Sequence, residues 1–145
     1  MAKQIQPPDL CKAGLEHGEQ SALICWCALP EVKQLYPDAT KLFAINNNAG
    51  LGDKKKGAMR GLQSKMAGVK AGVLDLFLPV ARQGFHGLFV EMKVRKLKPK
   101  RKGGKGGCSD GQIDFMIQVR ADGFAACVCY GWEEAAQALM QYLVE

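Results

Sequence analysis

Two apolar segments that lie close together in the chain limit its fold more than any other feature. Residues 73–80 read VLDLFLPV, residues 87–94 read GLFVEMKV, and only the polar connector 81–86 separates them. Short apolar runs of this kind predict strands that are buried on both faces. We therefore expect both segments in the central sheet of a domain whose helices cover that sheet.

The spacing of apolar residues and the turn signals around them predict the other elements. Helical spacing predicts helices over residues 15–29, 55–68, 109–121 and 132–144. Shorter apolar runs predict further strands at residues 42–45 and 124–130. Pro30 is expected to end the first helix. The resulting order predicts an α/β or α+β domain in which helices flank a central mixed sheet.

The length of the chain suits one domain. A chain of 145 residues fits a single domain, which we place at residues 15–145. Pro7, Pro8 and Gly14 predict an irregular lead-in over residues 1–14. The sequence contains neither an apolar run of about 20 residues that could span a membrane nor the apolar core of a signal peptide. We therefore expect a cytoplasmic protein.

The cysteines and several apolar side chains are expected in the core. Two cysteine pairs have the form CxC, a shorter spacing than zinc modules usually show. We therefore predict that their members are small buried hydrophobic residues: Cys25, Cys27, Cys127 and Cys129. Other apolar side chains could face either the core or a partner, and the core is the expected place for Leu15, Ile24, Trp26 and Leu35.

The positive charge of the chain is concentrated in one segment. The net charge is +6, and the segment from Lys93 to Lys105 holds eight basic residues and no acidic one. Such a run can be a solvated tract or a contact for a polyanion. Under the second interpretation two groups of side chains would hold phosphates: Lys54, Lys55, Lys56 and Arg60, and Arg95, Lys96, Lys98, Lys100, Arg101, Lys102 and Lys105.

Three charged residues in the two central segments could form a catalytic centre. Asp75 interrupts an apolar strand, where an uncompensated carboxylate would be costly. Glu91 and Lys93 are two positions apart on the next strand, so both point to the same face. If the strands are neighbours, Asp75 and Glu91 can converge on a hard cation such as Mg²⁺. Such a cation activates water for phosphodiester hydrolysis, and Lys93 could orient or deprotonate that water.

A purely structural interpretation of the same residues stays open. Glu91 and Lys93 could be an ordinary ion pair on one face of the strand. Asp75 could lie at a strand end, where water would compensate its charge. The E-x-K triplet alone is common, and only its combination with the preceding acidic strand, the basic run and a capped helix is specific.

The combined pattern resembles the PD-(D/E)xK nuclease superfamily. It is most similar to the virus-type replication-repair nuclease (VRR-NUC) family in its compact phage and bacterial form. The resemblance covers roughly residues 15–143. It rests on a first helix with acids and a glutamine, then FAINN, GVKAGVLDLFLP, FVEMK, a helix with an early glutamine, and CVCYGWEEAAQAL. It implies a restriction-endonuclease-like core.

The resemblance assigns roles to residues of the two central segments. Asp75 and Glu91 would bind a divalent metal, Mg²⁺ or Mn²⁺, together with the backbone carbonyl of Met92. Lys93 would be the catalytic lysine. Leu74 stands where the family usually has proline, a departure that removes no metal ligand.

The resemblance also assigns roles to residues on two helices. The first helix would supply a further acid to the metal. Glu16 fits the family's E-x-x-x-Q spacing better than Glu19 does and is preferred. Gln112 would border the catalytic site. Its spacing from Ser109 equally predicts a capping box, and the two roles could coexist. The family usually has an aromatic residue after this glutamine, and Phe115 could serve as that residue here.

These observations predict a metal-dependent endonuclease that acts on DNA. Phosphate contacts position a substrate without reading its sequence, so we expect selectivity for DNA structure. By resemblance the substrate would be branched DNA, such as four-way (Holliday) junctions, cut by a homodimer in the cytoplasm of the host cell if the protein is phage-encoded. The alternatives are a non-catalytic nucleic-acid-binding module on a degenerate nuclease fold, and a protein whose basic loop binds an acidic partner.

Overall fold

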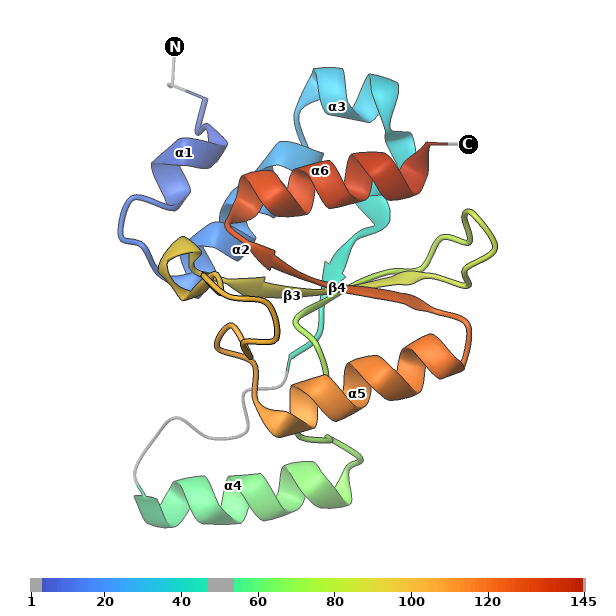
Figure 1. The fold of residues 1–145 in the computed structure, drawn as a ribbon. Coiled ribbons are helices and arrows are strands. Elements are labelled where there is room, and N and C mark those ends of the chain that lie inside the picture. The colour runs from blue at the N-terminus through green and yellow to red at the C-terminus, as the bar shows by residue number, and fades with distance from the viewer. Residues whose placement is uncertain (1–3, 47–53, 145) are drawn as a thin grey trace.

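A mixed sheet of four strands forms the centre of the molecule (Figure 1). The computed structural model describes residues 4–46 and 54–144, and of residues 54–57 only the backbone. The strands are β1 (Phe43–Ala44), β2 (Leu76–Leu78), β3 (Leu88–Lys93) and β4 (Ala125–Tyr130). β2 is antiparallel to β1 and to β3, whereas β3 and β4 are parallel. The predicted central mixed sheet is thus confirmed.

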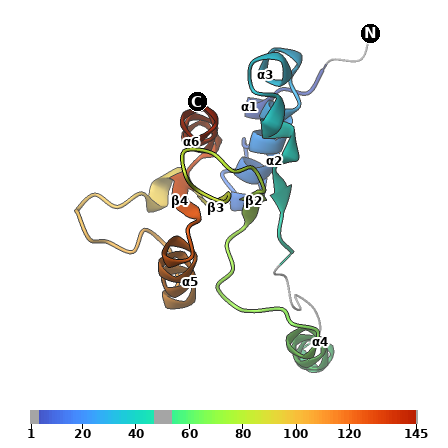
Figure 2. The same cartoon turned by 90° about the vertical axis from the view of Figure 1, so that its right-hand side faces the viewer.

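Helices cover the sheet unevenly (Figures 1 and 2). On one face lie α2 (Glu16–Cys27) and α6 (Trp132–Leu143), and α5 (Asp110–Ala121) lies on the other. The short helices α1 (Pro7–Leu10) and α3 (Pro30–Leu35) and the 3-10 turn Pro37–Lys41 adjoin α2. A second 3-10 turn, Arg95–Leu97, follows β3. α4 (Lys54–Met66) stands apart from the sheet, and its apolar side chains Met59, Leu62 and Met66 are exposed.

Alternation along the strands divides the core into two parts. Leu76, Leu78, Val90 and Met92 point toward α2 and α6, where they pack with buried residues such as Leu139. The opposite face of β3 carries Phe89, Glu91 and Lys93, because successive side chains of a strand alternate between its faces. On that side α5 covers a smaller cluster of buried residues: Leu74, Cys108, Met116, Val119 and Ala126.

Several predictions about the N-terminal third were wrong. Residues 7–10 form a helical turn with proline at its start, rather than an irregular segment. α2 does end before Pro30, as predicted, but Pro30 also begins α3, which was not predicted; the first position of a helix tolerates a residue without an N–H donor. The side chains expected in the core are largely exposed at Leu15, Ile24 and Leu35, and only Trp26 packs against it.

The cysteines follow the prediction in part. Cys27 and Cys129 are buried, whereas Cys25 and Cys127 are partly exposed. All six cysteines of the chain are free thiols. In the described residues no helix combines the length and apolar character needed to cross a bilayer.

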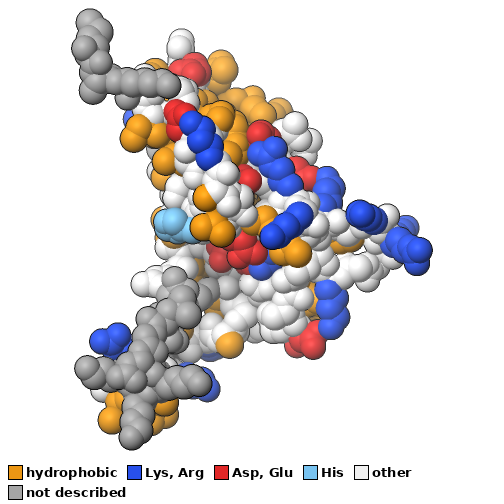
Figure 3. All heavy atoms as spheres, turned by 90° about the vertical axis from the view of Figure 1, so that its left-hand side faces the viewer, with side chains coloured by type: hydrophobic (Ala, Val, Ile, Leu, Met, Phe, Trp, Pro, Cys, Tyr) orange, Lys and Arg blue, Asp and Glu red, His pale blue; other side chains and the backbone are white. Residues whose placement is uncertain are grey.

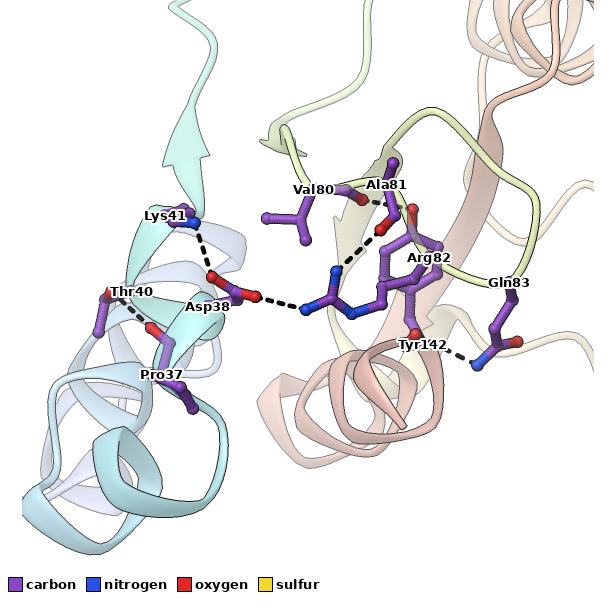
Figure 4. Close-up of polar contacts among 9 residues, drawn as sticks. All are labelled: Pro37, Asp38, Thr40, Lys41, Val80, Ala81, Arg82, Gln83 and Tyr142. Carbon is purple, nitrogen blue, oxygen red and sulfur yellow. Dashed lines mark hydrogen bonds and ion pairs between the residues drawn. The ribbon is translucent and has the colours of Figure 1, made fainter. Parts of the chain in front are cut away.

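The connector between β2 and β3 is fixed to the C-terminal helix and to the turn before β1 (Figure 4). Gln83 has a φ of 50° and donates from Nε2 to the carbonyls of Gln141 and Tyr142 at the end of α6. Arg82 pairs with Asp38 at 2.7 Å. The Tyr142 hydroxyl donates to the carbonyl of Val80 at 2.7 Å. These contacts hold the hairpin that carries the acidic residues described next.

Candidate active site

The antiparallel register of β2 and β3 brings the predicted acidic residues together. Leu76 is paired with Val90, and one more step in this register places Asp75 opposite Glu91. The Asp75 side chain lies directly before β2 and accepts a hydrogen bond from the Met92 N–H at 2.9 Å. Asp75 is therefore at a strand start rather than inside the strand predicted over residues 73–80.

Glu91 is the most buried charged residue of this group. Its side chain is 1% exposed. Its Oε1 accepts hydrogen bonds from Gln112 Nε2 at 2.5 Å and from Lys93 Nζ at 2.8 Å. Its Oε2 is buried, and no donor among the described residues lies within hydrogen-bonding distance of it. A buried carboxylate oxygen without a donor is unfavourable in a purely structural ion pair.

The electrostatic environment shifts the two neighbouring groups. Burial raises the pKa of Glu91 to about 7; the hydrogen bond from Lys93 opposes this shift, and the charge of Asp75 adds to it. Burial disfavours the charge on Lys93, but the hydrogen bond and charge contact with Glu91 outweigh burial and raise the pKa of the ammonium. Lys93 thus stays protonated beside a carboxylate that ionises with difficulty.

The structure separates the two acids of the first helix. Glu16 is exposed, and its Oε1 lies 3.6 Å from Lys93 Nζ, beside the other charged residues. Glu19 is buried, and its Oε2 accepts the N–H of Trp132 at 2.8 Å, which caps the start of α6. Glu19 is thereby committed to a structural contact. Geometry places Glu16, the preferred candidate, at the site.

Gln112 makes both of the contacts that its sequence position allowed. Its Oε1 accepts from the Ser109 N–H at 3.0 Å, and its own N–H donates to Ser109 Oγ at 3.2 Å, which completes a capping box. The remaining donor group, Nε2, binds Glu91. The cap therefore fixes the amide in the orientation that donates to Glu91, so the two geometries coexist.

The donor set suits a hard divalent cation. Asp75 and Glu91 supply oxygens, which Mg²⁺ and Mn²⁺ prefer, and the Oε2 of Glu91 has no hydrogen-bond donor among the described residues. Glu16 lies beside them, next to Lys93. Met92 could contribute only its carbonyl, because its side chain points into the core. In the described part of the chain no three His, Cys, Asp or Glu side chains lie close enough to form a complete cage. Mg²⁺ commonly takes one or two carboxylates and fills its shell with water and phosphate oxygens.

The predicted phosphate-binding residues divide into paired and unpaired cations. Arg95 pairs with Glu133, Lys98 with Glu134, and Lys105 with Asp110. No ion pair within the described residues involves the exposed side chains of Lys96, Lys100, Arg101 and Lys102, nor that of Arg60 on α4. The side chains of Lys54, Lys55 and Lys56 lie outside the described residues. Figure 3 shows the molecule from the left-hand side of Figure 1. Acidic side chains gather near the centre of that view, and basic side chains lie on the part that projects beside them.

The acids that bind the basic segment were not predicted from the sequence. Glu133 and Glu134 stand in the first turn of α6, 36 residues or more from their partners. The sequence marks them only as two adjacent acids at the start of a helix, later in the chain than the strongly basic run. Charge complementarity could have suggested an ion pair, but only the parallel pairing of β3 with β4 brings the start of α6 to the basic segment.

Comparisons with known proteins support the fold. Neither a protein-family model nor a curated protein matches the sequence. A solved structure described as "VRR_NUC domain protein" superposes with a TM-score of 0.62 at 20% sequence identity, over 88% of this chain and 87% of that chain. At this identity the likeness is one of fold. The chain therefore has a VRR-NUC-like mixed α/β fold, which is the architecture that its sequence motifs predicted.

Proposed function

We propose that this protein is a divalent-metal-dependent DNA endonuclease that hydrolyses phosphodiester bonds. One observation carries the proposal. Adjacent strands bring Asp75 and Glu91 together, and Glu91 keeps a buried oxygen without a donor although Lys93 and Gln112 both bind its other oxygen. A hard cation would give this oxygen a partner.

The residues of the site divide the chemical work between them. Asp75 and Glu91 would hold Mg²⁺ or Mn²⁺, with the Met92 carbonyl and Glu16 as further candidate ligands. The bound ion would activate water and neutralise charge that develops on the phosphate. The Lys93 ammonium, fixed by Glu91, is placed to hold a phosphate oxygen or to orient the attacking water. Gln112 keeps Glu91 in position from α5.

The substrate that we propose is branched DNA, and the working unit a homodimer. The exposed, unpaired cations of the basic segment suit phosphates, which carry no sequence information. Four-way junctions have two-fold symmetry, so two matched cuts call for two identical sites related in the same way. The exposed apolar side chains Leu15, Ile24 and Leu35 are available for an interface between copies.

A non-catalytic nucleic-acid-binding module is the second candidate. It is favoured by the 2.8 Å pair between Lys93 and Glu91 and by the hydrogen bond between Asp75 and the backbone, which satisfy part of the charge without a metal. This candidate explains the basic segment equally well. It gives no reason for the unpartnered oxygen of Glu91.

A cleavage panel tests the proposal. Labelled single-stranded, duplex, flap and four-way-junction DNA are incubated with the protein and Mg²⁺ or Mn²⁺, with and without EDTA. Metal-dependent cleavage, strongest on branched DNA and absent from Asp75→Asn, is expected. Tight DNA binding without cleavage under any metal would favour the binding module.

A further inference from the structure

The basic segment after β3 contains a loop that the rest of the molecule fixes at both ends. We define the basic loop as residues 98–106. At its start, Lys98 pairs with Glu134. The other oxygen of Glu134 accepts the Tyr130 N–H at 2.8 Å. At the end of the loop, the Tyr130 hydroxyl donates to the carbonyl of Gly106 at 3.1 Å. Glu134 and Tyr130 together therefore close the loop against the junction of β4 and α6.

Glycine is required where the loop closes. Gly106 has a φ of 55°, and a Cβ built there would lie 1.7 Å from the Tyr130 hydroxyl oxygen. A Cβ at Gly107 would lie 2.8 Å from the side chain of Leu97. Close backbone approach of this kind is what glycine permits. The glycines thus fit a defined loop conformation rather than an unstructured solvated tract.

The anchoring divides the cations of the loop into two groups. Lys98 is occupied by Glu134, whereas the three cations at the tip are exposed and have no ion-pair partner in the described part of the chain; we call Lys100, Arg101 and Lys102 the tip cations. The segment that contains the loop connects Lys93 on β3 with Gln112 on α5, the two residues that bind Glu91. The position of the tip is therefore tied to the catalytic strand and to α5.

We propose that Glu134 is a positioning residue that holds the tip cations where they bind the DNA backbone. This inference rests on the proposed function. Glu134 itself contacts no DNA: it acts through Lys98 and through the Tyr130 N–H. The expected effect of its removal has an unusual sign. Removing a negative charge near a polyanion should strengthen binding by simple electrostatics, whereas removing Glu134 weakens binding because the loop loses its anchor.

A matched pair of variants separates these two effects. Glu134→Gln removes the ion pair with Lys98 and retains an oxygen that can accept the Tyr130 N–H. Glu133→Gln removes the same charge from the neighbouring position, where Glu133 pairs with Arg95 before the loop begins. DNA affinity is measured against salt concentration for both. We expect Glu134→Gln to bind more weakly, with a log–log slope reduced by about 0.9 for each phosphate that the loop no longer binds, and Glu133→Gln to bind at least as tightly as wild type.

Limited trypsin digestion measures the anchoring without DNA. Pro99 protects the bond after Lys98, and cleavage after the tip cations, identified by mass spectrometry and counted apart from cleavage after Lys105, reports the tip. Cleavage after the exposed Lys70 is an internal reference. Glu134→Gln should raise tip cleavage roughly two- to fivefold, the range for a partly exposed ion pair acting on a local opening equilibrium. Lys98→Gln should raise it similarly, and the double variant no further.

The outcomes distinguish this inference from the proposed function. Unchanged tip cleavage in both single variants would overturn the anchoring. Increased cleavage together with DNA binding as tight as that of Glu133→Gln would overturn the positioning role while leaving the nuclease proposal intact. A wild-type protein that binds no DNA would defeat the proposed function and the positioning role together, and the digestion would then report the anchoring alone.

Discussion

Ionisation of Glu91 should make the metal-free protein less stable as pH rises. Burial raises the pKa of this carboxyl to about 7 in the folded protein, against an ordinary value of 4.5. The folded state therefore keeps a proton that the unfolded chain has already released between these values. The free energy of unfolding falls with rising pH wherever the folded state binds more protons. The contribution of Glu91 is fully favourable below about pH 4.5 and is lost by about pH 7.

The size of this loss follows from the two pKa values. A difference from 4.5 to about 7, at about 1.4 kcal/mol per unit, gives on the order of 3 kcal/mol. This is a large part of the roughly 5–15 kcal/mol that stabilises a typical domain. Glu91→Gln removes the ionisation while its amide oxygen can still accept from Gln112 and Lys93. The variant should thus lack this component of the pH dependence.

Urea unfolding of the wild type and of Glu91→Gln between pH 5 and 8, in the presence of EDTA, measures the effect. The difference between the two stabilities cancels contributions common to both proteins, and it should shift by on the order of 3 kcal/mol in favour of the variant as pH rises. Saturating Mg²⁺ at pH 8 should restore stability to wild type only, by about 2.7 kcal/mol at a hundredfold excess over Kd. A difference that does not vary with pH would refute the assigned burial of an ionisable Glu91.

The remaining predictions concern activity and assembly. Asp75→Asn and Glu91→Gln should abolish cleavage and leave DNA binding largely intact in a gel-shift assay; cleavage at the wild-type rate with saturating Mg²⁺ would show that neither carboxylate is a necessary ligand. Lys93→Ala should lower turnover by about 10²-fold or more at saturating substrate, and a change in affinity alone would make Lys93 a phosphate anchor. Replacing the tip cations by glutamine should reduce the log–log salt slope of duplex binding by about 0.9 for each phosphate that they bind, and an unchanged slope would exclude the loop from the DNA interface. Light scattering at micromolar concentration should give twice the chain mass of 15.8 kDa, and a monomer that still makes paired junction cuts would contradict the symmetry argument.

The sequence predicted the elements better than their ends. Periodicity identified α2, α5, α6 and the strands of the sheet from their apolar patterns, and it identified α4 from a weaker one. It overestimated the strand at residues 73–80, since strand length depends on the partner. β2 ends after Leu78, which pairs with Leu88 at the start of β3, because Pro79 has no N–H donor to continue the ladder. Apolarity also failed to separate core from surface at Leu15 and Leu35, which are exposed.

The centre of the candidate site was predictable, and its surroundings were not. Asp75, Glu91 and Lys93 stand out because charges are rare in apolar strands, and alternation then fixes their common face. Glu133 and Glu134, which pair with the basic segment, carry no such signal, since acids are ordinary in the first turn of a helix. Their role depends on contacts across 36 residues or more, which local patterns do not encode.

The balance of charges favours a site selected for function over one selected for stability. Replacing buried ion pairs by apolar residues is often neutral or stabilising, and the face of β3 that carries Glu91 and Lys93 already borders an apolar cluster around Phe89 and Leu74. Two further polar groups, Gln112 and the Met92 N–H, hold Glu91 and Asp75 in place. Even so, one buried oxygen of Glu91 has no donor among the described residues. A cluster kept for stability alone gains nothing from a buried carboxylate oxygen without a donor, whereas a cation-binding site requires a carboxylate oxygen that can bind the ion.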